Sequence, residues 1–187
     1  MDLNGNSYKI LKRPYGLFIL LFFKGGKLKM AVRYNIDRWP TASPSRLLAN
    51  VYGEHILNIE ASEDGWNGMI VGKGDYLGFE YFEEAEAGDF EGIIVDQMAN
   101  GNYYVLVTKA DDNCYFVYNA PVVETEWTND FKQEKNFYIK KGELMRSHKL
   151  AVDDGFELSA DGFDGEPYVG AAISGVSGRK PVVEASA

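Results

Sequence analysis

The fold class of this chain is decided by the stretch FEGIIVDQMANGNYYVLVT, residues Phe90 to Thr108. Two short runs of bulky and β-branched residues are separated here by Ala-Asn-Gly-Asn. Asn-Gly supplies the positive-φ residues that a tight connection between antiparallel strands needs. The runs Phe90 to Asp96 and Tyr103 to Thr108 therefore predict a β-hairpin.

The same rhythm continues through most of the chain beyond residue 45, where short apolar or alternating runs end at Gly, Asn or Asp. No window keeps a helical period for three turns, and the many Tyr, Phe and Gly residues suit strands and tight turns. The sequence therefore predicts an all-β protein, built as an antiparallel β-barrel or a β-sandwich. Further strands are expected at Val51 to Ile59, Trp66 to Val71, Tyr76 to Phe82, Cys114 to Tyr118, Val122 to Trp127, Phe137 to Lys140, Leu144 to Leu150, Phe156 to Ser159 and Tyr168 to Ile173.

A chain of 187 residues can bury one sizeable core or two small ones. We expect one β domain over residues 51–187. Within it, MIVGKGDYLGF (Met69 to Phe79) and FYIKKGELMRS (Phe137 to Ser147) share an apolar pair, a Lys-Gly-acid turn and a second apolar run. A duplication is one explanation, and it predicts two small lobes, 51–120 and 121–187.

The residues before the β domain differ from it in charge. Residues 1–29 carry six Lys and Arg against Asp2 alone, although the whole chain has a net charge of −9. The apolar run Tyr15 to Phe23 is far shorter than the ~20 residues that cross a bilayer. As a signal peptide it has a basic start, but KGGKLKM stands where a small-residue cleavage site belongs. We expect instead that Met30 starts the native protein and that residues 1–29 are upstream sequence read in frame, or a disordered leader.

Residues 30–50 are predicted to form an extended arm, because Pro40 and Pro44 disfavour helix. A disordered or surface-draped N-terminus explains the same residues. The arm combines positive charge with an aromatic ring, and its expected partner-binding residues are Arg33, Arg38, Trp39 and Arg46. The acidic remainder repels phosphate backbones, which excludes direct nucleic-acid binding and favours a basic or neutral partner surface. No membrane contact is expected.

The sequence offers no catalytic signature. H-E-x-x-H, G-x-S-x-G, a phosphate loop and a dinucleotide fingerprint are all missing. His55 and His148 are expected to be solvent-facing or locally hydrogen-bonded strand residues, and Cys114 a buried structural thiol. We therefore predict a protein without enzymatic activity, cofactor or metal.

Two alternatives to this structural interpretation stay open. Asp161, Asp164 and Glu166 have the oxygen ligands that Ca²⁺ prefers, although Asp beside Gly is also ordinary turn chemistry. A sugar-stacking platform is the alternative to core packing for Trp39, Trp66 and Trp127.

The C-terminal third reads NFYIKKGELMRSHKLAVDDGFELSADGFDGEPYVGAAISG. This succession of strand, Lys-Gly-acid turn, Arg-containing strand, Asp-Asp-Gly turn and Tyr-Val-Gly resembles the β-rich decoration or cement proteins of tailed-phage heads, over about Met69 to Ser174. The resemblance implies a non-enzymatic virion protein on the capsid exterior that binds the major capsid protein, forms homo-oligomers and stabilises the shell. The alternative is a carbohydrate- or receptor-binding β module of a phage tail or cell surface.

Overall fold

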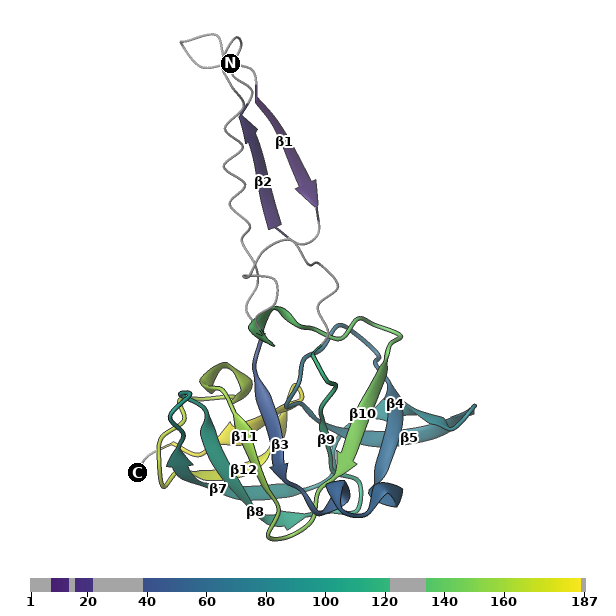
Figure 1. Cartoon of the computed structure of the whole chain (residues 1–187), viewed down its shortest axis with the longest axis vertical. Helices are drawn as coiled ribbons and strands as arrows, with labels where there is room; N and C mark the ends of the chain where they lie inside the picture. Colours follow the sequence, from purple (N-terminus) through teal and green to yellow (C-terminus); the bar gives the residue numbers. More distant parts are fainter. Residues whose placement is uncertain (1–7, 14–15, 22–38, 122–133, 186–187) are drawn as a thin grey trace. The chain divides into compact units, whose positions relative to one another are not determined.

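A computed structural model of the chain describes residues 8–13, 16–21, 39–121 and 134–185 (Figure 1). The chain divides into two compact units, Met1–Arg38 and Trp39–Ala187, which are described separately.

The first unit contains an antiparallel hairpin of β1 (Tyr8–Arg13) and β2 (Gly16–Leu21). The apolar run that the sequence places in a leader thus supplies the second of these strands. Within the residues that the structure describes, no helix is long and apolar enough to cross a membrane.

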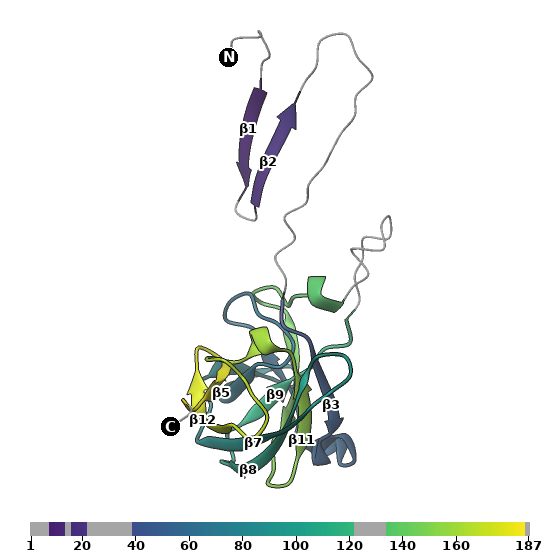
Figure 2. The same ribbon diagram turned by 90° about the vertical axis from the view of Figure 1, so that its left-hand side faces the viewer.

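One layer of the second unit is a six-stranded antiparallel sheet in the order β13-β12-β7-β8-β11-β3 (Figure 2). The predicted hairpin of Phe90 to Thr108 lies at its centre, and Gly101 takes a φ of 88° in the connecting turn. The strands are β3 (Ala42–Arg46), β7 (Phe90–Gln97), β8 (Tyr103–Ala110), β11 (Gly155–Leu158), β12 (Ala172–Ser177) and β13 (Lys180–Val183).

The other layer is a closed five-stranded barrel in the order β10-β4-β6-β5-β9. β4 and β6 pair in parallel, and the other neighbours are antiparallel. The strands are β4 (Ile56–Glu60), β5 (Ile70–Gly78), β6 (Tyr81–Ala85), β9 (Tyr115–Val117) and β10 (Leu144–Lys149). Single 3₁₀ turns are η1 (Leu48–Asn50), η2 (Gly53–His55), η3 (Glu134–Asn136) and η4 (Ala160–Gly162).

Two hydrophobic cores follow from these layers. The larger one joins sheet residues such as Phe90 and Phe156 to barrel residues such as Phe116, and the rings of Phe116 and Phe156 lie 4.6 Å apart between centroids. The smaller one fills the barrel and includes Met69 and Met145. Because successive side chains of a strand point to opposite sides, β9 contributes to both cores and is buried on both faces. The prediction of an all-β protein is confirmed.

The two edges of the open sheet each carry a proline. Pro44 lies in β3 and Pro181 in β13. Proline has no N–H to donate, so both edges are poor templates for a further strand. The closed barrel has no edge at all.

The extended arm predicted over residues 30–50 is described from Trp39 onward, and those residues belong to the second unit. β3 pairs with β11, while Ala42, Leu47 and Ala49 are buried. An apolar residue at each of these positions explains why the segment packs on the sheet.

The predicted lobes 51–120 and 121–187 are not separate bodies, because the barrel takes β10 from the second range and the sheet takes β7 and β8 from the first. The suggested duplication also differs in structure. Lys73 to Asp75 continue within β5, whereas Gly142 takes a φ of 80° in a turn before β10.

Several predicted strand bounds are wrong, mainly at glycines. β4 begins only at Ile56, after the turn at Gly53, and β12 begins after Gly170, whose φ is 91°. The predicted strand Tyr76 to Phe82 contains the turn between β5 and β6, and Phe137 to Lys140 contributes only an isolated bridge from Ile139 to Gly65. β3 and β13 were not predicted, and Val122 to Trp127 lies outside the described residues.

Candidate functional site

The four residues predicted to contact a partner do not form one site among the residues described. Arg33 and Arg38 lie outside the described ranges. Trp39 precedes β3 and Arg46 ends it, so the two side chains are separated by the length of that strand.

Trp39 is held in an aromatic stack. The centre of its ring lies 5.9 Å from that of Trp66 and 5.6 Å from that of Tyr138, each at 22° between planes. The backbone N–H of Trp39 donates to the backbone carbonyl of Lys135 at 2.7 Å. Lys180 places its Nζ 5.5 Å from the centre of the Trp66 ring. The rings thus stack on one another, as in packing, rather than forming an open row for a sugar. Trp127, the third residue of that predicted platform, lies outside the described residues.

Arg46 belongs to the side of the six-stranded sheet that faces away from the barrel. Its guanidinium carbon lies 5.9 Å from the centre of the Tyr104 ring, close enough for a cation–π contact. Gly155, between the two strands, allows this arrangement, because a Cβ there would overlap the Tyr104 ring. The hydroxyl end of the Tyr104 ring therefore lies against Gly155 of β11.

A row of cross-strand partners continues from Arg46 across this side of the sheet. Arg46 pairs with Gly155, Gly155 with Leu106, Leu106 with Ile93, and Ile93 with Ala172. Directly opposed residues in a sheet point to the same side, so these residues share one surface. We call it the outer face. Its centre consists of Tyr104, Leu106, Ile93, Val95 and Ala172, Arg46 lies at one end, and Asp96 and Glu157, which are directly opposed to Tyr104, lie on the same surface.

The centre of the outer face is apolar and partly exposed to solvent. Ile93 is 41% exposed and Val95 46% exposed, and Leu106 is half-buried. Sequence reasoning missed these residues, although GIIV and YYVLV carry a signal. Such uninterrupted apolar runs are typical of strands buried on both faces, and here one of those faces is open.

Acidic side chains flank the apolar centre of the outer face. Asp96 and Glu157 are the cross-strand neighbours of Tyr104. At the far end of β8, Lys109 donates to Glu91 and Asp89, at 3.3 Å each, and these hydrogen bonds raise the pKa of its ammonium group. Four carboxylates against Lys109 and Arg46 leave a negative rim, which favours a basic or neutral partner.

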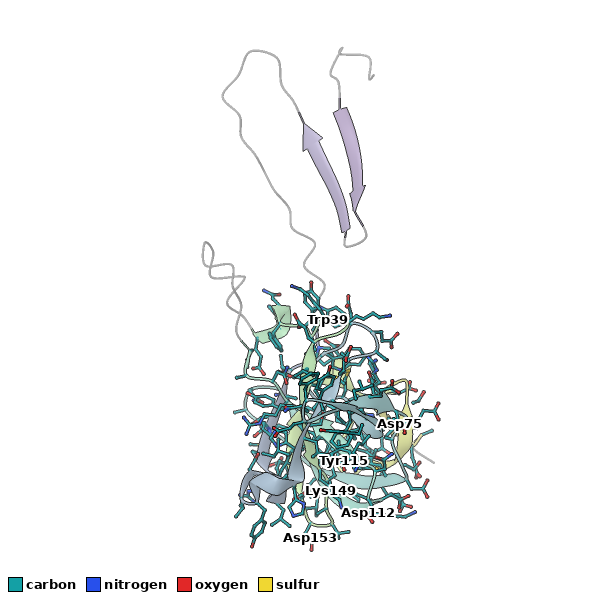
Figure 3. All side chains as sticks on the ribbon, turned by 90° about the vertical axis from the view of Figure 1, so that its right-hand side faces the viewer. Trp39, Asp75, Asp112, Tyr115, Lys149 and Asp153 are labelled. Atoms are coloured by element: carbon teal, nitrogen blue, oxygen red, sulfur yellow. The ribbon has the colours of Figure 1, made fainter. Side chains whose placement is uncertain are left out.

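A separate open cavity of about 290 Å³ lies beside β10. At its rim Lys149 donates to Asp112 at 2.9 Å, which raises the pKa of the lysine and lowers that of the aspartate. Figure 3 shows this pair near Asp153, at the opposite end of the unit from Trp39. The cavity is lined by Leu48, Ala49, His55, Ala110, Asp112, Lys149, Leu150, Ala151 and Val152.

The prediction of two surface or locally hydrogen-bonded histidines is wrong for His148. Its side chain is 3% exposed, and neither ring nitrogen meets a hydrogen-bond partner among the described residues. Burial, with Arg146 nearby, lowers its pKa from 6.5 to about 4. His55 lies half-buried in η2. The alternating pattern misled the prediction because Ser147 and His148 are consecutive and both buried.

The other candidates for chemistry have structural surroundings. In the described part of the chain, no three His, Cys, Asp or Glu residues are grouped to hold a metal ion. Asp161 and Asp164 lie at η4 and beside β13, where Asp164 makes backbone hydrogen bonds to Pro181 and Val183. Cys114 is fully buried, as predicted, and burial raises the pKa of its thiol.

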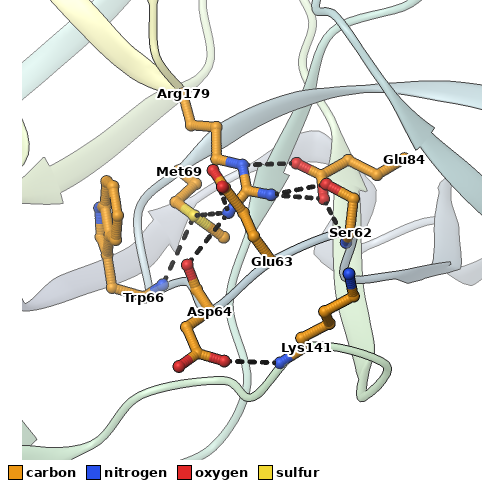
Figure 4. A network of polar contacts seen from close by, with 8 residues as sticks. All are labelled: Ser62, Glu63, Asp64, Trp66, Met69, Glu84, Lys141 and Arg179. Carbon is orange, nitrogen blue, oxygen red and sulfur yellow. Dashed lines mark hydrogen bonds and ion pairs between the residues drawn. The ribbon is translucent and has the colours of Figure 1, made fainter. Parts of the chain in front are cut away.

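A buried ion pair ties the two layers together (Figure 4). Arg179 reaches from the turn between β12 and β13 to Glu84 on β6, with Nε 2.6 Å from Oε1 and Nη2 2.7 Å from Oε2. The two side chains are only 11% and 6% exposed. Arg179 also donates to the Ser62 hydroxyl and the Asp64 carbonyl. Its φ of 70° follows the turn set by Gly178, and that Gly-Arg pair was the only signal for it in the sequence.

Comparisons with known proteins do not indicate a function. No protein-family model, curated protein or solved structure matches the chain.

Proposed function

We propose that the chain is a non-enzymatic structural protein of a phage virion, which binds the exterior of the capsid shell and stabilises it. The observation that carries the proposal is the outer face, whose partly exposed apolar centre lies on the open side of the six-stranded sheet. Surfaces of this kind mark contacts with another macromolecule more often than they mark chemistry.

The energetics favour a protein partner for the outer face. Covering the exposed parts of Ile93, Val95 and Leu106 contributes on the order of 1 kcal/mol for each side chain. The stack of Arg46 on Tyr104 adds a cation and an aromatic ring, two groups enriched at protein interfaces. The acidic rim is suited to a basic or neutral capsid surface.

The sheet edges are consistent with a role in a crowded lattice. Pro44 and Pro181 disfavour strand addition, so neighbouring copies can meet through side chains without extending the sheet. The resemblance of about Met69 to Ser174 to phage decoration proteins names the major capsid protein as the partner and homo-oligomers as the assembly. No cofactor or catalytic step is part of the proposal.

The test uses particles of the phage whose genome encodes the chain, made with and without its gene. We expect mass spectrometry to find the protein in purified particles, and particles without it to lose DNA at a lower temperature. Its absence from purified particles would end the proposal.

A matched pair of variants locates the contact. Ile93→Asn alters the outer face, whereas Leu144→Asn alters a side chain of similar exposure, 46%, on the barrel. Added to particles that lack the protein, Ile93→Asn should bind about tenfold more weakly than the wild type, and Leu144→Asn should bind normally. Equal binding of both variants would remove the outer face from the contact.

A further inference from the structure

The turn between β5 and β6 has an unusual conformation for its sequence. Gly78 pairs with Tyr81, so Phe79 and Glu80 form a two-residue hairpin loop. Their φ angles are 50° and 68°. Such loops strongly prefer Asn-Gly or Gly-Gly, because side chains with a full Cβ are strained at positive φ. A bulky aromatic residue followed by glutamate is therefore a poor choice for the turn itself.

Phe79 gains nothing from packing that would compensate for this strain. It is 93% exposed, the highest value for a large apolar side chain in the described residues. Tyr76 and Leu77, on the same hairpin, are 62% and 39% exposed. The end of β5 projects from the body of the unit (Figure 1). A strained and fully exposed aromatic residue at the tip of a projecting hairpin points to a role in recognition.

The hairpin is braced rather than loose. Glu80 donates its backbone N–H to the Tyr76 hydroxyl at 3.4 Å, and the Tyr76 ring lies 5.4 Å from that of Phe82. Lys73 covers Phe82, with its Nζ 5.1 Å from the ring centre. A tip held in this way loses little conformational entropy when it binds.

The charges around the tip indicate the kind of partner. Asp75, Glu80 and Glu83 are exposed on the hairpin, against Lys73 alone. An anionic membrane surface would repel this group, so membrane insertion of Phe79 is disfavoured. An apolar pocket of a protein, rimmed by Lys or Arg, complements both the ring and the carboxylates.

We propose that the β5–β6 hairpin is an insertion element, which places Phe79 in a basic-rimmed apolar pocket of the capsid lattice. The inference rests on the proposed function for the identity of the partner. It adds a second contact, because Phe79 is not part of the outer face.

The test replaces Phe79 and Glu80 with the residues that the turn prefers. The double variant Phe79→Asn/Glu80→Gly relieves the strain, so we expect its Tm to rise by about 3 to 8 °C. Loss of the inserted ring should weaken its binding to particles lacking the protein by about 30-fold or more. Leu144→Asn again serves as the control and should bind like the wild type.

The outcomes separate this inference from the proposed function. If wild type and Leu144→Asn bind particles but the double variant, though more stable, does not, the insertion element is supported. If all three bind equally, the insertion element is refuted while the proposed function stands. If the wild type does not bind, both the insertion element and the proposed function are refuted. If the Tm of the isolated double variant is no higher than that of the wild type, the turn is not strained, and this result needs no binding partner.

Glu80→Gln tests the basic rim on its own. It keeps the length of the side chain and removes the charge, so binding should weaken several-fold and become less sensitive to NaCl than wild-type binding. Unchanged affinity and salt dependence would show that the pocket has no basic rim.

Discussion

Lowering the pH from 7 to 5 should destabilise the second unit through His148. This side chain lies on β10, opposite Phe116 of β9, and is 3% exposed. Burial in this setting, with the positive charge of Arg146 as a smaller cause, lowers its pKa from 6.5 to about 4. The native protein therefore keeps the imidazole neutral under conditions in which the unfolded chain protonates it.

The size of the effect follows from the two pKa values. Above pH 6.5 His148 is neutral in both the native and the unfolded protein, so it does not lower the free energy of unfolding. As the pH falls below 6.5, only the unfolded chain gains the proton. The resulting loss of free energy of unfolding grows until the pH reaches about 4. It amounts to about 2 kcal/mol at pH 5 and approaches about 3 kcal/mol below pH 4.

The assay is urea denaturation of the wild type and His148→Leu at several pH values. Other titrating groups are common to both proteins and cancel in the difference between their free energies of unfolding. Between pH 7 and pH 5 we expect the wild type to lose about 2 kcal/mol more than His148→Leu. Met145→Leu, in the same strand, is the control and should change stability by an amount that does not depend on pH. A wild type and a His148→Leu variant with parallel pH profiles would refute the reasoning.

Two further predictions follow from buried groups. Arg179→Met leaves the Glu84 carboxylate buried without its ion-pair partner and should lower the free energy of unfolding in urea by about 3 to 5 kcal/mol. Arg179→Met/Glu84→Met should recover most of this loss. A double variant as unstable as the single one would contradict the prediction. Cys114 should react with a thiol reagent only as fast as the protein unfolds, because its sulfur is buried and donates to the Asp89 carbonyl at 3.4 Å; rapid labelling of the native protein would show that the site opens locally.

The sequence predicts the parts of this fold that depend on local chemistry. The hairpin of β7 and β8 is evident from Asn-Gly between two β-branched runs, and the all-β class follows from repetition of that pattern. The strand β3 is harder to predict, since Pro44 is unfavourable in most strands and is tolerated here only because β3 lies at an edge. Strand order, barrel closure and the parallel pairing of β4 with β6 depend on contacts between distant segments.

The candidate site is harder to predict from the sequence than the fold is. Ile93 and Ile94 are neighbours of the same type, yet one lies on the open outer face and the other is fully buried. Only the arrangement of the layers decides which face is covered. Phe79 is likewise an ordinary strand residue in the sequence, and its significance comes from a backbone conformation that the residue type does not favour.

The interleaving of the two layers has a consequence for how the protein is made. β10 closes a barrel begun by β4, and β11 lies between β8 and the first strand of the sheet, β3. A nascent chain that ends after β9 can therefore complete neither layer. Strands synthesised early must wait for partners that leave the ribosome much later, and pairing across such separations is slow. We expect the second unit to fold after synthesis in one cooperative step, and to lose both layers together when it unfolds.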